Sequence, residues 1–198
     1  MSNFLTKRRE PFQFMLYLGI ASSALLFLFV FLVFVKKELV NQDIPVQLPG
    51  SFWLSTLLIL TSSVTLQLVS RALDNQQFAL HRHLLMATYF LALGFLMTQI
   101  WGWMSLLRNN ILPSNNTGGS FIFILSGLHL IHTLGGLVAL SLVVYNSMKN
   151  RSYIDSFVDS VNPPNILRLK LVTLYWHFLD IVWIIIFLFF LWHSSANS

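Results

Sequence analysis

The stretch YWHFLDIVWIIIFLFF, residues 175–190, decides the fold class of this chain. It belongs to an apolar run, residues 171–192, that is long enough to cross a bilayer, which takes about 20 helical residues. The run nevertheless contains the imidazole of His177 and the carboxyl group of Asp180. Because ionisable groups are costly in lipid, both side chains are expected to face protein or water.

The rest of the sequence predicts four more helices of this kind. Of its 198 residues, 56% are hydrophobic and only 10% are charged, which is typical of a membrane protein. The first run continues well past the length of a signal-peptide core, so we expect it to be retained. We predict an all-α polytopic membrane protein, one membrane domain over residues 1–198, with five transmembrane helices at 12–35, 52–70, 84–107, 121–145 and 171–192.

The basic residues predict the orientation of the bundle. If the amino terminus is cytoplasmic, the opposite face holds only Lys36, Lys37 and Arg108. The cytoplasmic face then holds the other nine of the 12 basic residues, namely Lys7, Arg8, Arg9, Arg71, Arg82, Lys149, Arg151, Arg168 and Lys170. This asymmetry follows the positive-inside rule, with the amino terminus in and the carboxy terminus out. The net charge of +5 thus reflects topology, and nucleic-acid binding is not expected.

The residue types present restrict the chemistry. The sequence contains no cysteine, which excludes disulfides, thiolate metal sites and iron–sulfur clusters. It also contains no P-loop, HExxH or GxSxG motif and no paired acidic catalytic site, so an autonomous enzyme is not expected.

Two predicted spans carry the intramembrane ionisable groups. In SGLHLIHTLGG, residues 126–136, His129 and His132 stand at i and i+3 and share one side of the helix, and His177 and Asp180 repeat that spacing. At about 1.5 Å per residue, His132 lies about 16 Å below the outer end of its span, and Asp180 lies about 13 Å above the inner end of the next. In a hydrocarbon core about 30 Å thick these two depths nearly coincide.

We therefore expect the last two helices to pack with these groups facing each other. Asp180 would accept a hydrogen bond from an imidazole of His129, His132 or His177, while small residues permit close approach at Gly127, Gly135 and Gly136. Three roles are open for this cluster: a structural polar network between helices, a proton relay, or a bis-histidine haem site. The last would need His177 as one ligand, because two imidazoles on one helix side cannot reach both faces of a porphyrin.

Other polar residues within or near the spans have structural interpretations. Gln99, beside Trp101 and Trp103, is expected to anchor a helix end, and His81 and His83 are expected at the membrane surface. Hydroxyl groups are expected to be small or back-bonding members of helix contacts, as at Ser22, Ser23, Thr61, Ser62, Ser63 and Thr65.

Three separated motifs resemble subunit III of the haem–copper oxidases, above all the cytochrome c oxidase type. YWHFLDIVW resembles the signature of the last helix, including Tyr175, Trp176 and Trp183. SGLHLIHTLGG resembles the Gly-x-His-x-x-His pattern of the preceding helix, with Gly127 first and Gly136 later. STLLILTSSVTL, residues 55–66, resembles an Asn-Thr-rich helix of the family. Five helices match the shorter form of this family.

Two positions depart from the family pattern. In LGIASSALLF, residues 18–27, Ser23 stands where the family usually has an intramembrane glutamate. In QIWGW, which begins at Gln99, Gly102 replaces an acid. The roles in lipid binding, oxygen access or proton uptake that are attributed to these two glutamates are therefore not carried over to Ser23 and Gly102.

The resemblance implies a non-catalytic accessory subunit in a bacterial cytoplasmic membrane. Such a subunit binds no haem or copper itself, and these cofactors are expected in partner subunits. It packs against catalytic subunit I, stabilises the complex, holds lipids, favours proton uptake and lies near an oxygen access route. Other oxidase subunits, membrane lipids and a larger respiratory supercomplex are further expected partners.

The sequence is also compatible with other complexes for such a subunit and with a function of a different class. An accessory subunit of a quinol oxidase or nitric oxide reductase would have a related sequence. A free-standing membrane b-type haem protein is the alternative from another class.

Overall fold

The computed structural model describes residues 10–40, 48–112, 117–149, 157–158 and 162–196. Within these ranges there is no strand, and five helices are long and apolar enough to cross a membrane, which confirms the predicted fold class. In chain order they are α2 (Glu10–Val40), α3 (Ser51–Asp74), α4 (Phe78–Arg108), α5 (Thr117–Lys149) and α7 (Pro163–Ala196). Each extends past its predicted span at both ends, because backbone hydrogen bonding continues into the polar residues that flank the apolar run.

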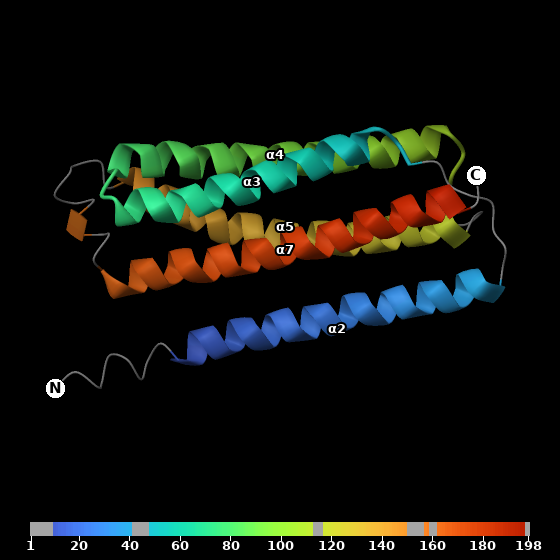
Figure 1. Ribbon diagram of the computed structural model, residues 1–198, viewed down its shortest axis with the longest axis horizontal. Coiled ribbons are helices and arrows are strands. Elements are labelled where there is room, and N and C mark those ends of the chain that lie inside the picture. Colours follow the sequence, from blue (N-terminus) through green and yellow to red (C-terminus); the bar gives the residue numbers. More distant parts are fainter. Residues whose placement is uncertain (1–9, 41–47, 113–116, 150–156, 159–161, 197–198) are drawn as a thin grey trace.

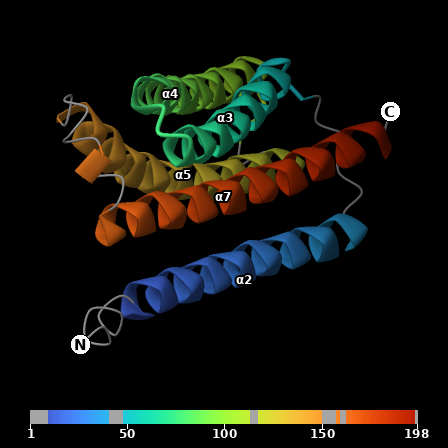
Figure 2. The same cartoon turned by 60° about the vertical axis from the view of Figure 1, so that its left-hand side comes forward.

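Four helices form the main bundle, and the remaining helix lies along one side of it (Figure 1). The bundle consists of α3, α4, α5 and α7, with α3 packed closely on α4 and α5 on α7. Helix α2 runs beside α5 and α7 and stands apart in both views (Figure 2). Only 11% of its apolar stretch is buried, against 50% for α7, so α2 has the smaller packing surface.

Helices α3 and α4 pack along stripes with a three-and-four spacing. Such spacing places side chains along one face of each helix and suits a shallow crossing angle. Small residues recur in both stripes, which lets membrane helices approach closely. The buried stripe of α3 is Phe52, Ser55, Ile59, Ser62, Leu66, Val69 and Ala72. That of α4 includes Phe78, His81, Leu85, Thr88, Ala92, Phe95, Gln99, Gly102 and Leu106.

The turn between α3 and α4 is closed by local backbone hydrogen bonds. The backbone N–H of Gln77 donates to the carbonyl of Ala72 at 2.8 Å. Gln76, which precedes Gln77, has a φ of 57°. This left-handed residue ends α3 in the manner of a Schellman motif and satisfies carbonyls that the helix leaves free. Asn110, with a φ of 58°, occupies the equivalent place after α4.

Candidate functional site

Two side-chain hydrogen bonds join α3 to α4 inside the bundle. Gln99 Nε2 donates to Ser55 Oγ at 2.8 Å, and the hydroxyls of Thr65 and Thr88 are 2.8 Å apart. The expectation that Gln99 anchors a helix end is wrong, since its residue is 1% exposed and α4 continues to Arg108. A buried amide must find partners inside the protein, and the hydroxyl of Ser55 supplies one.

Two buried tryptophans of α7 donate to hydroxyls of α3. Trp176 Nε1 lies 3.1 Å from Ser62 Oγ, and Trp183 Nε1 lies 3.0 Å from Thr56 Oγ1. These indoles are 1% and 0% exposed, so each N–H needs an acceptor within the protein. The two bonds place matched donors and acceptors along the α3–α7 contact.

The sequence reasoning missed Thr56 and expected the other hydroxyls to be small or back-bonding members of helix contacts, without naming partners on another helix. Back-bonding does occur at Ser22, Thr61, Ser62 and Thr65, whose hydroxyls donate to carbonyls three or four residues earlier. Several of these hydroxyls also accept or share a second bond across a helix contact. The bonds between helices could have been predicted from two features of the sequence: one predicted span contains two indole donors, and another contains a run rich in hydroxyl acceptors.

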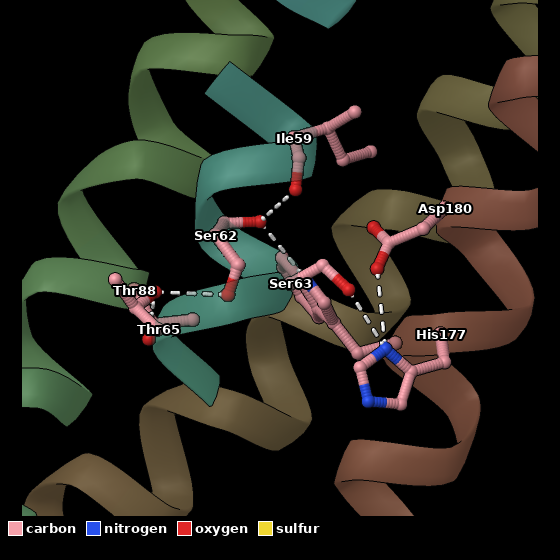
Figure 3. Close-up of polar contacts among 8 residues, drawn as sticks. Ile59, Ser62, Ser63, Thr65, Thr88, His177 and Asp180 are labelled. Atoms are coloured by element: carbon pink, nitrogen blue, oxygen red, sulfur yellow. Dashed lines mark hydrogen bonds and ion pairs between the residues drawn. The ribbon is translucent and has the colours of Figure 1, made fainter. Parts of the chain in front are cut away.

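Ser63, His177 and Asp180 form a polar cluster between α3 and α7 (Figure 3). The hydroxyl of Ser63 lies 2.8 Å from His177 Nδ1, and the same nitrogen lies 3.5 Å from Asp180 Oδ2. The side chain of Asp180 is only 5% exposed, and neither of its oxygens has a hydrogen-bond partner among the described residues. Asp180 therefore faces the protein interior, with His177 as its nearest ionisable neighbour.

Of the three imidazoles expected as partners of Asp180, only that of His177 lies beside it, so the expectation that the polar groups of α5 and α7 face each other is corrected. The imidazole beside Asp180 comes from its own helix, one turn earlier, and the link to another helix runs to α3 through Ser63. No imidazole of α5 lies within 4 Å of the carboxyl group. The side chain of Asp180 could face α3 or α5 at the same depth, depending on how α7 is rotated about its axis. Equal depth in the membrane does not determine that rotation.

His129 lies in an aromatic part of the core. It is 0% exposed, and its ring centroid lies 5.2 Å from that of Trp183 and 5.7 Å from that of Phe95. Its Nε2 lies 3.2 Å from the hydroxyl of Thr133, whereas its Nδ1 has no partner among the described residues. The rings of Trp183 and Phe95 therefore pack close to the imidazole.

His132 connects α5 with α2 and α7. Its Nε2 lies 3.2 Å from the hydroxyl of Ser23 on α2, and its Nδ1 lies 2.8 Å from the carbonyl of Leu128. The hydroxyl of Tyr175 on α7 donates to the backbone carbonyl of His132 at 3.2 Å. The hydroxyl of Ser23 thus provides a neutral partner for an imidazole.

The glycines expected between α5 and α7 differ in their surroundings. A Cβ on Gly136 would lie 3.0 Å from Leu179 Cδ1, so this position keeps the two helices close. A Cβ on Gly135 would meet nothing within 4 Å, and one on Gly127 would make an ordinary contact with Trp103 at 3.6 Å. The indole N–H of Trp103 donates to Ser126 across the α4–α5 contact at 3.0 Å.

The surface location expected for His81 is wrong, whereas His83 is exposed. His81 is 8% exposed, and its Nδ1 lies 3.1 Å from the carbonyl oxygen of Val69. It occupies the buried stripe of α4, because the α3–α4 contact continues to the ends of both helices.

The composition Ser63–His177–Asp180 does not form a hydrolytic triad. In such a triad the carboxylate orients one ring nitrogen and the serine bonds to the other, which acts as the base. Here both Ser63 and Asp180 lie against Nδ1, so the serine is not placed for activation. Among the described residues, no group of three or more His, Cys, Asp or Glu side chains is arranged to hold a metal ion.

Comparisons with known proteins identify relatives over most of the chain. No family model matches it. It is 28% identical over 182 residues to the cytochrome bo(3) ubiquinol oxidase subunit 3 of Buchnera aphidicola subsp. Schizaphis graminum, which covers 89% of this chain and 90% of the relative. The protein of the same name from Pseudomonas putida is 27% identical over 132 residues, covering 67% of this chain and 59% of the relative.

A second group of relatives has a different printed name. The cytochrome c oxidase subunit 3 of Corynebacterium diphtheriae is 28% identical over 133 residues, covering 67% of this chain and 60% of the relative. The resemblance inferred from the motifs is thereby confirmed. The chain is a homologue of subunit 3 of the cytochrome bo(3) ubiquinol oxidases and of the cytochrome c oxidases.

Proposed function

We propose that the chain is a non-catalytic accessory subunit III of a terminal oxidase in a bacterial cytoplasmic membrane, bound to catalytic subunit I. The observation that carries this proposal is the alignment to an oxidase subunit 3 over 89% of the chain. Haem and copper would reside in the partner subunits. In this role the chain supplies a membrane-embedded surface and lipid-facing helices rather than reacting groups.

The interior contacts support a structural role. Buried amide and indole donors have hydroxyl acceptors on α3, as in the bonds from Gln99, Trp176 and Trp183. Bonds of this kind stabilise the positions of helices, each contributing about 0.6 kcal/mol on average in membrane proteins. Of the three roles open for the intramembrane polar residues, a structural network is the one we propose for His129, His132, His177 and Asp180.

Quinol is the electron donor that we propose for the host complex. Two alignments to ubiquinol oxidase subunits cover 89% of the chain, whereas the alignment to the Corynebacterium diphtheriae cytochrome c oxidase subunit covers 67%. A cytochrome c oxidase is the second candidate, supported by the relatives that carry that name. A dinuclear copper signal in the purified complex would favour cytochrome c as the donor, and its absence from a complex that oxidises quinol would favour quinol.

The topology that we propose places the amino terminus in the cytoplasm. The asymmetry of the basic residues supports it. Exposed tryptophans, Trp53, Trp101 and Trp192, lie toward the opposite end, near the start of α3 and the ends of α4 and α7. Amphipathic rings are frequent where a helix meets the lipid headgroups.

Co-purification with mass identification tests the proposal directly. A tagged chain extracted in mild detergent should bring with it a haem-containing catalytic subunit, identified by mass and by its visible spectrum. The chain purified alone should show no stoichiometric Soret band. A Soret band in the isolated chain that disappears in His177→Ala would replace the accessory-subunit proposal with a b-type haem protein.

A further inference from the structure

His177 lies within the apolar run of α7 and is only partly covered by this chain. The run begins after Lys170 and covers residues 171–192, so His177 lies about 9 Å from its first residue at about 1.5 Å per residue. The side chain of His177 is 29% exposed. Its Nδ1 faces Ser63 and Asp180, while Nε2 has no hydrogen-bond partner among the described residues (Figure 3).

An imidazole nitrogen at this depth needs a polar partner. With the proton on Nδ1, Nε2 offers a lone pair, and with the proton on Nε2 it offers an N–H group. The hydrocarbon core of a bilayer supplies neither donor nor acceptor, so the unpaired nitrogen would be destabilising if lipid covered it. A hydroxyl or amide side chain can serve either tautomer, because each contains both a donor and an acceptor.

The residues around His177 on the surface of α7 are apolar and exposed. Leu174 is 38% exposed, Ile181 58%, Ile185 56% and Leu188 57%. Together with His177 they recur every three or four residues and form one stripe, which we call the α7 stripe. Histidine is one of the polar side chains that hydrogen-bond across contacts between membrane helices.

Helix α5 provides a contrast within the same molecule. Its exposed stripe consists of Ile131, Leu134, Val138, Leu142 and Tyr145. Among these side chains only the tyrosine is polar, and it lies near the end of the helix, where headgroups are accessible. The α5 stripe is therefore suited to lipid in a way that the α7 stripe is not.

We infer that the α7 stripe docks on a transmembrane helix of another oxidase subunit, which presents a hydroxyl or amide side chain to His177 Nε2. The inference rests on the proposed function and adds to it the surface and the chemistry of the contact. The apolar residues of the stripe supply the packing area. The hydrogen bond to His177 sets the register of the two helices, as a single polar group does in helix pairs.

Site-specific photocrosslinking in the intact membrane complex tests the surface. A benzophenone amino acid is placed at Ile181 in the α7 stripe or, as the matched control, at Val138 in the α5 stripe, where exposure is 65%. We expect a crosslink to another oxidase subunit from position 181 and none from 138. A subunit crosslink from 138 alone, or crosslinks from 181 only to lipid or to a second copy of this chain, would overturn the inference while leaving the accessory role intact. Failure of the wild-type chain to co-purify with any oxidase subunit would instead reject the proposed function.

Substitution of His177 tests the hydrogen bond. His177→Phe removes both nitrogens from a ring of similar size, whereas His177→Gln keeps a polar amide. We expect His177→Phe to dissociate from the complex roughly three to fifteen times more readily than wild type, and His177→Gln less so. The unfolding of each isolated variant is measured in parallel. Equal losses in both variants, or a loss of retention that only mirrors a loss of chain stability, would show that Nε2 makes no bond to a partner.

Discussion

The backbone of Gly102 lies directly against the ring of Phe52. A Cβ added to Gly102 would stand 2.8 Å from Phe52 Cε2 and 2.9 Å from Ser51 Oγ, closer than real Cβ contacts. Phe52 is 0% exposed, and its ring stacks on Trp183 at 5.9 Å, so it has little room to move. Position 102 therefore has no room for a side chain unless Phe52 or Ser51 shifts, because α3 occupies the space.

Gly102→Ala should destabilise the α3–α4 contact. Alanine favours a helix by about 1 kcal/mol over glycine, but overpacking a filled contact typically costs about 1–3 kcal/mol. We expect a net loss of about 1 kcal/mol in the free energy of unfolding, measured by denaturation in mixed micelles. Gly94→Ala on the same helix is the control, since its Cβ would make an ordinary contact with Leu58 at 3.5 Å and should not destabilise. Equal stability of the two variants would contradict the geometry.

Adjacent glycines of α5 should respond in opposite directions. Gly136→Ala pushes against Leu179 at 3.0 Å and Tyr175 at 3.3 Å, whereas Gly135→Ala meets nothing within 4 Å. We expect Gly136→Ala to lower the free energy of unfolding by about 1 kcal/mol, because an overpacking cost of about 1–3 kcal/mol exceeds the helix preference of alanine. Gly135→Ala should be neutral or stabilising by up to about 1 kcal/mol. The same micelle denaturation measures both, and a larger loss at residue 135 would refute the assigned packing.

The hydroxyl of Ser23 should help hold α2 against α5. Ser23→Ala removes the contact with His132 Nε2 at 3.2 Å, while Ser22→Ala removes only a bond to the carbonyl of Gly19 in the same helix. Loss of an interhelical bond of this kind costs about 0.6 kcal/mol in membranes. Since the chain has no cysteine, spin labels can be attached specifically at Leu25→Cys and Val138→Cys.

The distance distribution between these labels reports the position of α2. We expect it to broaden in Ser23→Ala and to stay narrow in Ser22→Ala, since only the first substitution loosens the α2–α5 contact. Identical distributions for the two variants would mean that the contact between Ser23 and His132 does not restrain α2.

Thr56→Val should lower the free energy of unfolding, because it removes the hydrogen-bond acceptor of Trp183. Valine has nearly the shape of threonine but leaves the buried indole N–H without the oxygen that lies 3.0 Å away. An unpaired buried donor costs about 1–3 kcal/mol. Thr61→Val is the matched control, because this exposed hydroxyl bonds only to the carbonyl of Leu57. Denaturation curves that shift equally for both variants would exclude a stabilising role for the Thr56–Trp183 bond.

Asp180 should tolerate replacement by asparagine. Neither carboxyl oxygen has a hydrogen-bond partner among the described residues, and His177 keeps Ser63 at 2.8 Å in the absence of the acid. We expect Asp180→Asn to change the free energy of unfolding by less than about 1 kcal/mol, since it keeps the shape and loses no formed bond. Asp180→Leu should cost no more than about 1.5 kcal/mol, the usual range for a substitution that changes shape but leaves no group unpaired. Losses above about 3 kcal/mol in both variants would indicate that the charge itself is required.

The helices were predictable because membrane insertion depends on local composition. Any run of about 20 apolar residues must satisfy its backbone hydrogen bonds internally, and a helix does so without knowledge of its neighbours. For the same reason the burial of Asp180 and His129 was predictable, since a polar group in lipid turns toward protein. The helix ends were less predictable, because flanking polar residues are compatible with both helix and loop.

The partners of the intramembrane polar groups were not predictable in the same way. The depth of Asp180 and His132 along their helices follows from residue counting, but the side on which each faces depends on how every helix is rotated in the bundle. Asp180 consequently lies beside His177 and Ser63, while His132 contacts Ser23. Gln99 and His81 likewise proved to be buried, because the α3–α4 contact covers them.

The amino-acid sequence alone determined that this protein has five helices long and apolar enough to cross a membrane and that it resembles oxidase subunits, since both properties reside in short contiguous stretches. Only the tertiary structure decided that α3 carries the acceptors for α7, that Phe52 closes position 102, and that His177 Nε2 is left without a partner among the described residues. Pairing of side chains from separate helices is a property of their relative rotation and distance, and no single helix encodes it.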